Sequence, residues 1–386
     1  VSYGLVGNDQ IGGDRFLFLS SINKNVNGYF YGLSQQHVQG WTEDKIGVSN
    51  VTWETATKFD LGLDLELFNG KVSLQADYFN EDRDGILLRR GVVPNITGMT
   101  SNQIPWANIG IVKNSGFDGR LEIRNTTSYG LYYSTFANVT LAKNKIIEND
   151  SPIPKHEYQN TRGKRIDQPF GLLAIGFFES QEEINNSPRQ NFMAVVRPGD
   201  IKYRDVNGDG VIDDFDRVAI GYARTPELMY GFGGTVAYKG IDMTMNFTGA
   251  ARTSTFLDME GMYPFQLEYP NYNILHEYYD NRWVSGRDNS DAKYPAVING
   301  NNPNNFRTNT MYLKNASYLR LKVAEIGYNF PEQIAQSLSI EGLRLFVNGT
   351  DLLTFDKLKV VDPESNYGTG GYPRQRVINF GAQINF

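Results

Sequence analysis

A regular alternation of apolar and polar residues limits what this chain can fold into more than any other feature. In one segment every second residue is apolar, and these positions are Phe59, Leu61, Leu63, Leu65 and Leu67. After Asn69-Gly70 the alternation resumes with Val72, Leu74, Ala76 and Tyr78. Successive side chains of a strand point to opposite faces, and Asn-Gly favours the two-residue turn of a hairpin. The segment therefore predicts an antiparallel hairpin with one apolar face and one acid-bearing face.

The same pattern recurs along the chain. Further alternating segments are 117–124, 133–142, 232–238, 241–248 and 378–386. Lys239-Gly240 joins two of them by a short turn, whereas the connections 82–115, 143–197 and the segment after residue 248 are long. Short turns at one end of a sheet and long loops at the other are typical of outer-membrane barrels. We therefore expect an all-β fold, an antiparallel transmembrane β-barrel with long extracellular loops.

In such a barrel the apolar face contacts outer-membrane lipid and the polar face lines a wet lumen. The residues expected to face lipid include Phe59, Leu61, Leu63, Leu65, Val72, Leu74, Ile241, Met243, Ile384 and Phe386. Those expected to face the lumen include Asp64, Gln75, Asp242 and Gln383. The last strand ends on an aromatic residue, which resembles the signal by which the barrel-assembly machinery recognises outer-membrane proteins.

Composition narrows the function classes. The 386 residues contain no cysteine, which excludes disulfide scaffolds, zinc-thiolate sites and cysteine nucleophiles. A net charge of -6 without a cluster of Lys and Arg argues against nucleic acid as a partner. No apolar run approaches the roughly 20 residues of a membrane helix. Because the chain opens at Val1 with neither methionine nor a signal peptide, we expect a processed or truncated product.

The segment 199–217 carries a second strong pattern. Oxygen-bearing side chains stand at positions 1, 3, 5, 9 and 12 of a loop with glycine at position 6, which is the spacing of an EF-hand calcium loop. The predicted ligands are Asp205, Asn207, Asp209, the Val211 carbonyl, Asp213 and Asp216. Position 12 is aspartate rather than glutamate, as in calcium loops of the dockerin type. Ile212 is expected to anchor the loop on apolar surface.

A turn without metal is the alternative for this segment, because Asn207-Gly208 and Asp209-Gly210 are also good turn dipeptides. The flanking residues 200–204 and 229–238 indicate strands rather than the paired helices of a calcium sensor. A rigid extracellular calcium loop between strands is therefore the expectation.

No catalytic constellation is evident in the sequence. His37, His156 and His276 stand in no metal or triad spacing, and no glycine-rich stretch has the context of a phosphate loop. We therefore expect no enzyme activity. The loop 256–279 and the tryptophan after it are rich in aromatic side chains that suit contact with a sugar or a peptide, or packing against a partner. The candidate ligand contacts are Phe256, Tyr263, Phe265, Tyr269, Tyr272 and Trp283.

Several motifs together resemble one family. They are Gly199-Asp-Ile-Lys-Tyr-Arg-Asp-Val-Asn-Gly-Asp-Gly-Val-Ile-Asp213, Ser317-Tyr-Leu-Arg-Leu-Lys322 with Ile326-Gly-Tyr328 and Pro331, Asn348-Gly-Thr-Asp-Leu-Leu-Thr354, and Asp362-Pro-Glu364. Phe178-Glu-Ser-Gln-Glu-Glu-Ile184, and Asn108-Ile-Gly110 with Asn114-Ser-Gly116, fit the same family. In this order and over nearly the whole chain, the sequence resembles the C-terminal part of the SusC-like (SusC/RagA family) TonB-dependent outer-membrane transporters of Bacteroidetes.

The resemblance implies a barrel of about 22 strands with an N-terminal plug, a TonB box and a SusD-like surface lipoprotein as a lid. The chain departs from that pattern, because it contains neither plug nor TonB box and only about a dozen predicted strands. Residues 1–386 are therefore expected to be the C-terminal barrel portion. The plug and the first strands belong to a missing N-terminal portion, through which TonB would act.

The expected function is TonB-dependent import of oligosaccharide or peptide nutrients, with this chain forming part of the barrel wall and the loops that face substrate and lid. The alternative is a secreted, calcium-stabilised β-rich binding or adhesion module. In lipid, an open sheet edge leaves amides and carbonyls unpaired, so the strand ending at Phe386 must pair with a first strand. We expect that strand in the missing portion rather than within 1–33, which lacks clear alternation.

Overall fold

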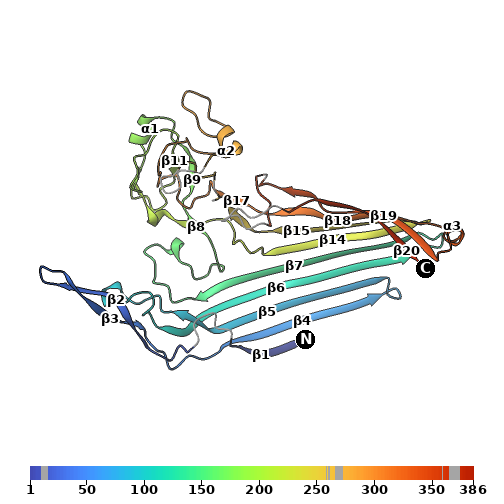
Figure 1. Ribbon diagram of the computed structural model, residues 1–386, viewed down its shortest axis with the longest axis horizontal. Helices are drawn as coiled ribbons and strands as arrows, with labels where there is room; N and C mark the ends of the chain where they lie inside the picture. The colour runs from blue at the N-terminus through green and yellow to red at the C-terminus, as the bar shows by residue number, and fades with distance from the viewer. Residues whose placement is uncertain (10–15, 258, 260, 266–272, 359, 365–373) are drawn as a thin grey trace.

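The computed structural model describes residues 1–9, 16–257, 259, 261–265, 273–358, 360–364 and 374–386. Ten long strands form one antiparallel sheet in the order β1-β4-β5-β6-β7-β14-β15-β18-β19-β20. Their bounds are β1 (Ser2–Asn8), β4 (Glu54–Leu67), β5 (Val72–Arg89), β6 (Trp106–Thr126), β7 (Tyr132–Glu148), β14 (Leu228–Tyr238), β15 (Ile241–Ala251), β18 (Tyr318–Asn329), β19 (Gly342–Asp356) and β20 (Val377–Asn385). Figure 1 shows these strands side by side, with short turns at one end and large loops at the other. We call these the turn end and the loop end.

The register places the alternating residues as the sequence predicts. Leu65 pairs with Leu74, whereas Asp64 pairs with Gln75. Directly paired residues of neighbouring strands lie on the same face of a sheet. The apolar and polar faces therefore continue from strand to strand, which confirms the predicted antiparallel sheet with two unlike faces.

The apolar face is left open by the rest of the described chain. Its exposed large side chains include Leu61, Leu63, Phe232, Ile241, Met243, Leu353 and Ile384. A continuous exposed apolar surface of this kind marks contact with lipid or with another protein. Among the residues that the structure describes, no helix is long and apolar enough to cross a membrane.

The turn-end connections are short, as the sequence predicts. Lys239 and Gly240 alone separate Tyr238 from its partner Ile241. Their φ angles are 48° and 84°, the positive values that a two-residue hairpin turn requires. The longer connection between β18 and β19 contains α3 (Glu332–Ser337).

Strand β7 is longer than the alternation predicts, since the segment 143–197, expected to be a connection, contains its end. Strands β5 and β6 are longer too: the segment 82–115, expected to be a single connection, contains the end of β5 and the start of β6, so both expectations are wrong. Here the faces carry charges, since Arg83 contacts Glu54 and Glu81, and the register shifts between Arg83 and Ile86. Alternation is lost although pairing continues. With 18 and 21 residues, both strands exceed the roughly 9–11 residues that cross a membrane.

The described parts of the two longest connections of the sheet fold together at the loop end into one loop unit (the described residues of 168–223 and 253–316), which Figure 1 shows above the sheet. Its core consists of Leu172, Phe192, Ile201, Tyr203, Ile212, Leu257, Met262, Tyr278, Tyr294 and Tyr312. Its elements are β8 (Phe170–Gly171), β9 (Ala174–Phe177), α1 (Gln181–Asn185), β10 (Arg189–Gln190), β11 (Ile201–Tyr203), β12 (Val211–Ile212), η3 (Asp214–Asp216), β13 (Val218–Ala219), β16 (Ser254–Phe256), α2 (His276–Asp280) and β17 (Leu313–Asn315).

The remaining elements also lie in loop-end connections. Strands β2 (Ser21–Tyr31) and β3 (Gln36–Lys45) form a separate antiparallel hairpin between β1 and β4. Two short 3-10 helices, η1 (Asn95–Thr97) and η2 (Glu157–Gln159), follow β5 and β7. The loop end therefore carries most of the irregular structure, and the candidate sites lie there.

Candidate functional site

The predicted calcium loop lies in the loop unit, between β11 and β13. Gly208 and Gly210 have positive φ angles of 75° and 82°, which let the chain bend tightly around Asp205. The Asp205 carboxylate accepts hydrogen bonds from the Gly208 amide at 2.7 Å and from the Gly210 amide at 2.9 Å. Ile212 is buried in the core of the loop unit, as expected. The loop is thus organised around its first carboxylate and anchored by its isoleucine.

Asp216, the last predicted ligand, closes the loop. Its side chain is fully buried. Oδ1 accepts a hydrogen bond from the Val206 amide at 2.7 Å, and Oδ2 accepts one from the Asp213 amide at 2.9 Å. These bonds provide the partners that a buried carboxylate requires. One aspartate therefore contacts both the beginning and the end of the loop.

Tyr158, in the η2 segment, lies against this loop, and the charge of the loop affects its pKa. Its hydroxyl donates a hydrogen bond to a loop carbonyl, that of Phe215, at 2.7 Å. The pKa of Tyr158 is raised, first by burial and then by the negative charges of Asp216, Asp209, Asp205 and Asp213. Four of the predicted ligands therefore act on one phenol.

The described ranges contain no group of three or more His, Cys, Asp or Glu side chains arranged to hold a metal ion. In the loop, Asn207 Oδ1 accepts from the Asp209 amide and Asp209 Oδ1 accepts from the Val211 amide, each at 2.9 Å. By type the residues suit calcium, which prefers oxygen ligands. Binding requires these oxygens to converge on one point, so calcium binding stays a prediction.

The aromatic residues predicted to contact ligand lie mostly inside the loop unit. Phe256 and Tyr263 pack against its core, and Trp283 is only 6% exposed. Phe265 is 38% exposed. Tyr269 and Tyr272 lie outside the described residues. Within the described part of this set, Phe265 offers the most accessible ring, and ligand contact by this loop stays a prediction.

A buried polar network joins the two segments of the loop unit. Asp200 is 1% exposed, and its carboxylate accepts hydrogen bonds from the side-chain amides of Asn302 at 2.8 Å and Asn305 at 2.9 Å. Burial raises the pKa of Asp200, although the hydrogen bonds act in the opposite direction. The partners are 102 and 105 residues away in the sequence, so no local pattern predicts them.

Arg320, at the loop end of β18, brings together three of the sequence motifs. Its side chain is fully buried, and its guanidinium contacts Glu364 at 2.6 Å, Asp362 at 2.7 Å and Asp351 at 3.7 Å. Tyr318 of the same strand donates its hydroxyl to Glu364 at 2.6 Å. The motifs at 317–322, 348–354 and 362–364 therefore meet at one point. Sequence reasoning found these motifs but missed this contact.

Two cavities lie on the polar side of the sheet near the loop unit. The larger, of about 740 Å³, adjoins the Arg320 cluster and is lined by β7, β14 and β15, by the start of β18 and by residues of the loop unit. The second, of about 490 Å³, is lined by several charged residues, Glu54, Glu81, Arg83, Arg165, Asp167 and Glu227. Both volumes fall within the range of about 300–1,000 Å³ typical of ligand pockets.

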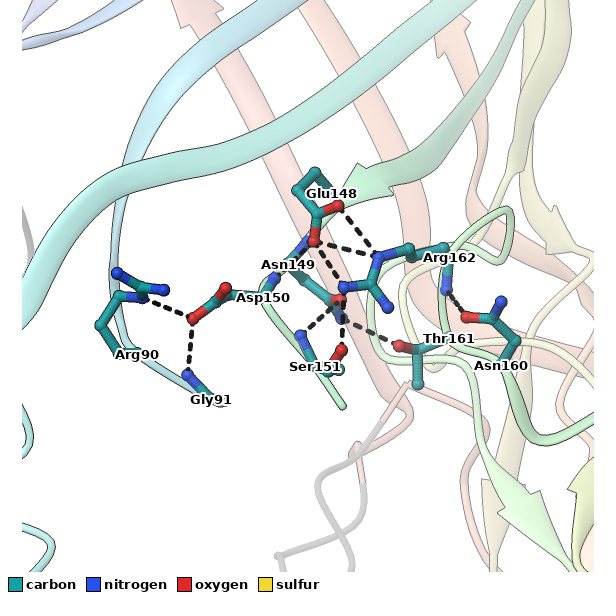
Figure 2. Close-up of polar contacts among 9 residues, drawn as sticks. All are labelled: Arg90, Gly91, Glu148, Asn149, Asp150, Ser151, Asn160, Thr161 and Arg162. Atoms are coloured by element: carbon teal, nitrogen blue, oxygen red, sulfur yellow. Dashed lines mark hydrogen bonds and ion pairs between the residues drawn. The ribbon is translucent and has the colours of Figure 1, made fainter. Parts of the chain in front are cut away.

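A separate ion-pair network fastens the loops that follow β5 and β7 (Figure 2). Glu148, the loop-end residue of β7, accepts hydrogen bonds from Arg162 Nη2 at 2.7 Å and from the Asp150 amide at 2.7 Å. The bonds from Arg162 and from backbone amides lower the pKa of Glu148 to about 2. Asp150 accepts from Arg90 Nε at 2.8 Å and from the Gly91 amide at 2.9 Å. The network therefore holds one loop against the other.

Comparisons of the sequence agree on one group of proteins, although no family model matches the chain. Over its whole length the chain is 29% identical to TonB-dependent receptor P3 and 27% identical to TonB-dependent receptor P26, both of Formosa agariphila. It is 22% identical, over 98% of its length, to TonB-dependent receptor SusC of Bacteroides thetaiotaomicron. The chain spans 39% of the length of each of the first two relatives and 36% of SusC.

Solved structures give the same result for the fold. The RagAB peptide transporter matches all of this chain with a TM-score of 0.73 and 21% identity, over 40% of the transporter chain. The RagAB peptide importer in its open-open state matches with a TM-score of 0.71 and 21% identity, over 39% of that chain. At this identity the likeness establishes the fold, and the predicted barrel-type sheet is confirmed.

Proposed function

Since this chain is the C-terminal part of a SusC-like TonB-dependent receptor of the outer membrane, we propose that the complete protein imports nutrients in a TonB-dependent way. In this proposal residues 1–386 form the C-terminal part of the barrel wall. The relatives are named as receptors, and the similar structures as a peptide transporter and importer. These names favour transport rather than catalysis.

The two unlike faces of the ten-stranded sheet carry the proposal. The apolar face exposes large side chains along the strands, and the opposite face holds polar networks. One such network on the polar face joins Arg344 to Glu325 at 2.7 Å, and Asn348 to the same Glu325 at 3.1 Å. A barrel wall needs this division, because lipid lies on one side and a wet or protein-filled lumen on the other.

The partners follow from the same proposal. We expect an N-terminal portion to supply the remaining strands and the plug, and TonB to act through that portion. A SusD-like surface lipoprotein would cover the loop unit as a lid. The cargo is an oligosaccharide or a peptide; the similarity to a peptide importer and to SusC supports import without choosing between them.

Calcium is proposed as a structural ion of the 199–217 loop. The support is the spacing of its oxygen-bearing residues, the fully buried Asp216 and the four carboxylates whose negative charge acts on Tyr158. A divalent cation would offset the negative charge of these carboxylates. The ion would make the extracellular loop rigid, since the flanking segments are strands rather than the helices of a sensor.

Gene deletion with complementation tests the proposed function. The host strain without the full-length gene should lose growth on one class of oligosaccharide or peptide and regain it with the wild-type gene. A TonB-deficient strain should show the same loss, because import needs the energy that TonB transmits. A medium where simple sugars and amino acids supply all nutrients is the control.

The runner-up function, a secreted calcium-stabilised adhesion module, makes opposite predictions. Such a protein stays soluble without detergent and is found outside the outer-membrane fraction. It also leaves growth on oligosaccharides and peptides unchanged when its gene is deleted. Any of these three results would overturn the import proposal.

A further inference from the structure

The cavity of about 740 Å³ presents hydrogen-bonding groups that the described chain leaves unused. Asn138 and Thr140 on β7, Thr248 on β15 and Thr255 in the loop unit line it. Across the described residues, none of these four side chains makes a hydrogen bond. Neighbouring groups are engaged, since Thr253 donates its hydroxyl to the Arg224 carbonyl at 2.6 Å. The lining therefore combines a fixed frame with free hydroxyl and amide groups.

One wall of the cavity is fixed by the buried Arg320. Glu364 lines the cavity and is held by Arg320 at 2.6 Å, by Tyr318 at 2.6 Å and by Arg374 at 2.9 Å. The contacts at this wall join three cations to three carboxylates, namely Arg320, Lys322 and Arg374 to Asp351, Asp362 and Glu364. Their charges balance, so the wall presents little net charge to the cavity.

The chemistry of the lining favours one class of ligand. Hydroxyl and amide side chains satisfy the many hydroxyls of a sugar, and aromatic side chains can cover its apolar ring faces. Phe136 and Tyr318 supply the aromatic surface here. The charged ends of a short peptide need unengaged partners of opposite charge, whereas the carboxylates and cations of this wall are already paired with one another.

We propose that this cavity is a binding site for a short oligosaccharide, with Thr140 and Thr248 as hydrogen-bonding contacts and with Arg320 as the residue that positions the Glu364 wall. The inference rests on the proposed import function and narrows its cargo from two classes to one. Because the site lies beneath the loop unit on the polar face, it is placed to receive cargo that has passed the extracellular loops.

The test uses the complete protein, purified in detergent. An array of short oligosaccharides is compared with an array of short peptides, and the best ligand is then titrated by calorimetry. The double variant Thr140→Val with Thr248→Val removes two hydroxyls at nearly constant volume and should raise Kd roughly tenfold. Thr350→Val, on the polar face of β19 and outside the cavity lining, is the matched control and should leave Kd unchanged.

A third variant addresses the wall. Tyr318→Phe removes one hydrogen bond to Glu364 and should weaken oligosaccharide binding several-fold without lowering the melting temperature. A purely structural role for Tyr318 predicts the reverse, a lower melting temperature with unchanged Kd.

The outcomes separate this site from the general function. Binding of peptides alone, or of no oligosaccharide, overturns the inference, as does an equal Kd for the double variant and the Thr350→Val control. If the variants bind normally while deletion of the gene still abolishes growth on one nutrient class, import stands and this site is wrong. If deletion changes no growth, the import proposal itself fails.

Discussion

Replacing Arg320 by methionine isolates the contribution of the buried ion cluster at the loop end. The side chain is fully buried and donates to Glu364 at 2.6 Å, Asp362 at 2.7 Å and Thr354 Oγ1 at 3.0 Å. Methionine keeps the aliphatic stem but leaves Asp362 without its cation, whereas Glu364 keeps Arg374 and Asp351 keeps Lys322. Removing one partner of a buried ion pair typically costs about 3–5 kcal/mol, because the remaining charge stays buried and uncompensated. Because the Asp362 side chain is 14% exposed, we expect a loss at the lower end of that range, about 3 kcal/mol.

Arg374→Met is the matched control, because Arg374 contacts the same carboxylate from an exposed position. Its side chain is 43% exposed and lies 2.9 Å from Glu364 Oε2. Exposed ion pairs contribute about 0–1 kcal/mol, so this variant should change little. Hydrogen exchange at the amides of 318–322 and 360–364 measures the local opening free energy in both variants.

We expect a clear difference in local opening free energy between the Arg320→Met and Arg374→Met variants, and a partial rescue of Arg320→Met. Adding Asp362→Asn to Arg320→Met should recover part of the loss, because the uncompensated charge is gone. Equal exchange in the Arg320→Met and Arg374→Met variants would refute the argument that burial makes Arg320 decisive. Absence of any rescue would show that packing, rather than charge, accounts for the loss.

Three further predictions concern the sheet faces, the loops and the metal. Leu63→Arg should lower the free energy of unfolding from lipid vesicles by about 2–4 kcal/mol and Asp64→Arg by much less, because only the first places a charge in lipid. Because the pKa of Glu148 is lowered from 4.5 to about 2, its pairing with Arg162 stabilises the loops fully above pH 4.5 and is lost as the pH falls through about 2. Pepsin cleavage of the loop after β7 should rise across that range. Millimolar calcium should protect the 199–217 loop from proteolysis in the wild type and not in Asp209→Ala.

Each of these has an internal control. Equal sensitivity of the two sheet faces would indicate a dry core on both sides instead of a membrane wall. Glu148→Gln cannot titrate, so a pH response identical to the wild type would show that another group controls the loop. Calcium without effect on the wild-type loop, in titration and in proteolysis, would support a metal-free turn.

The sequence predicted the sheet where one face is apolar and the other wet. From Leu61 to Leu67 and from Ile241 to Thr248 each residue's face follows from period 2 alone, and the Lys239-Gly240 turn follows from the positive φ that glycine permits. The prediction failed at Asp82–Arg89, where the strand continues beyond the alternating segment. With charged residues on both faces at Asp82 and Arg83 and a register shift after Arg83, hydrophobicity no longer reports strand pairing.

The candidate sites depend on contacts that sequence reasoning cannot reach. The calcium-type loop was found because its ligands lie within twelve successive residues. Arg320 was not assigned a role, because its partners Asp362 and Glu364 lie 42 and 44 residues away and a buried arginine has no local signature. The core of the loop unit likewise joins residues such as Tyr203 and Asn304, which are 101 residues apart.

The two edge strands of the sheet show which further strands a closed barrel requires. Strand β1 pairs with β4 only from Glu54 to Asp60, so the edge of β4 from Leu61 to Leu67 has no partner among the described residues. At the other edge, the described part of the chain pairs β20 with β19 alone.

In lipid each unpaired amide and carbonyl costs several kcal/mol, and no water can satisfy it. Leu61, Leu63 and Leu65 lie on this edge strand, and their apolar side chains are exposed. If the sheet spans the membrane, lipid therefore surrounds the unpaired stretch of β4. Closure therefore requires further strands against both β4 and β20. We infer that a strand of an N-terminal portion pairs with Leu61–Leu67 in continuation of β1, and a cysteine pair placed across that register would crosslink only if this arrangement is correct.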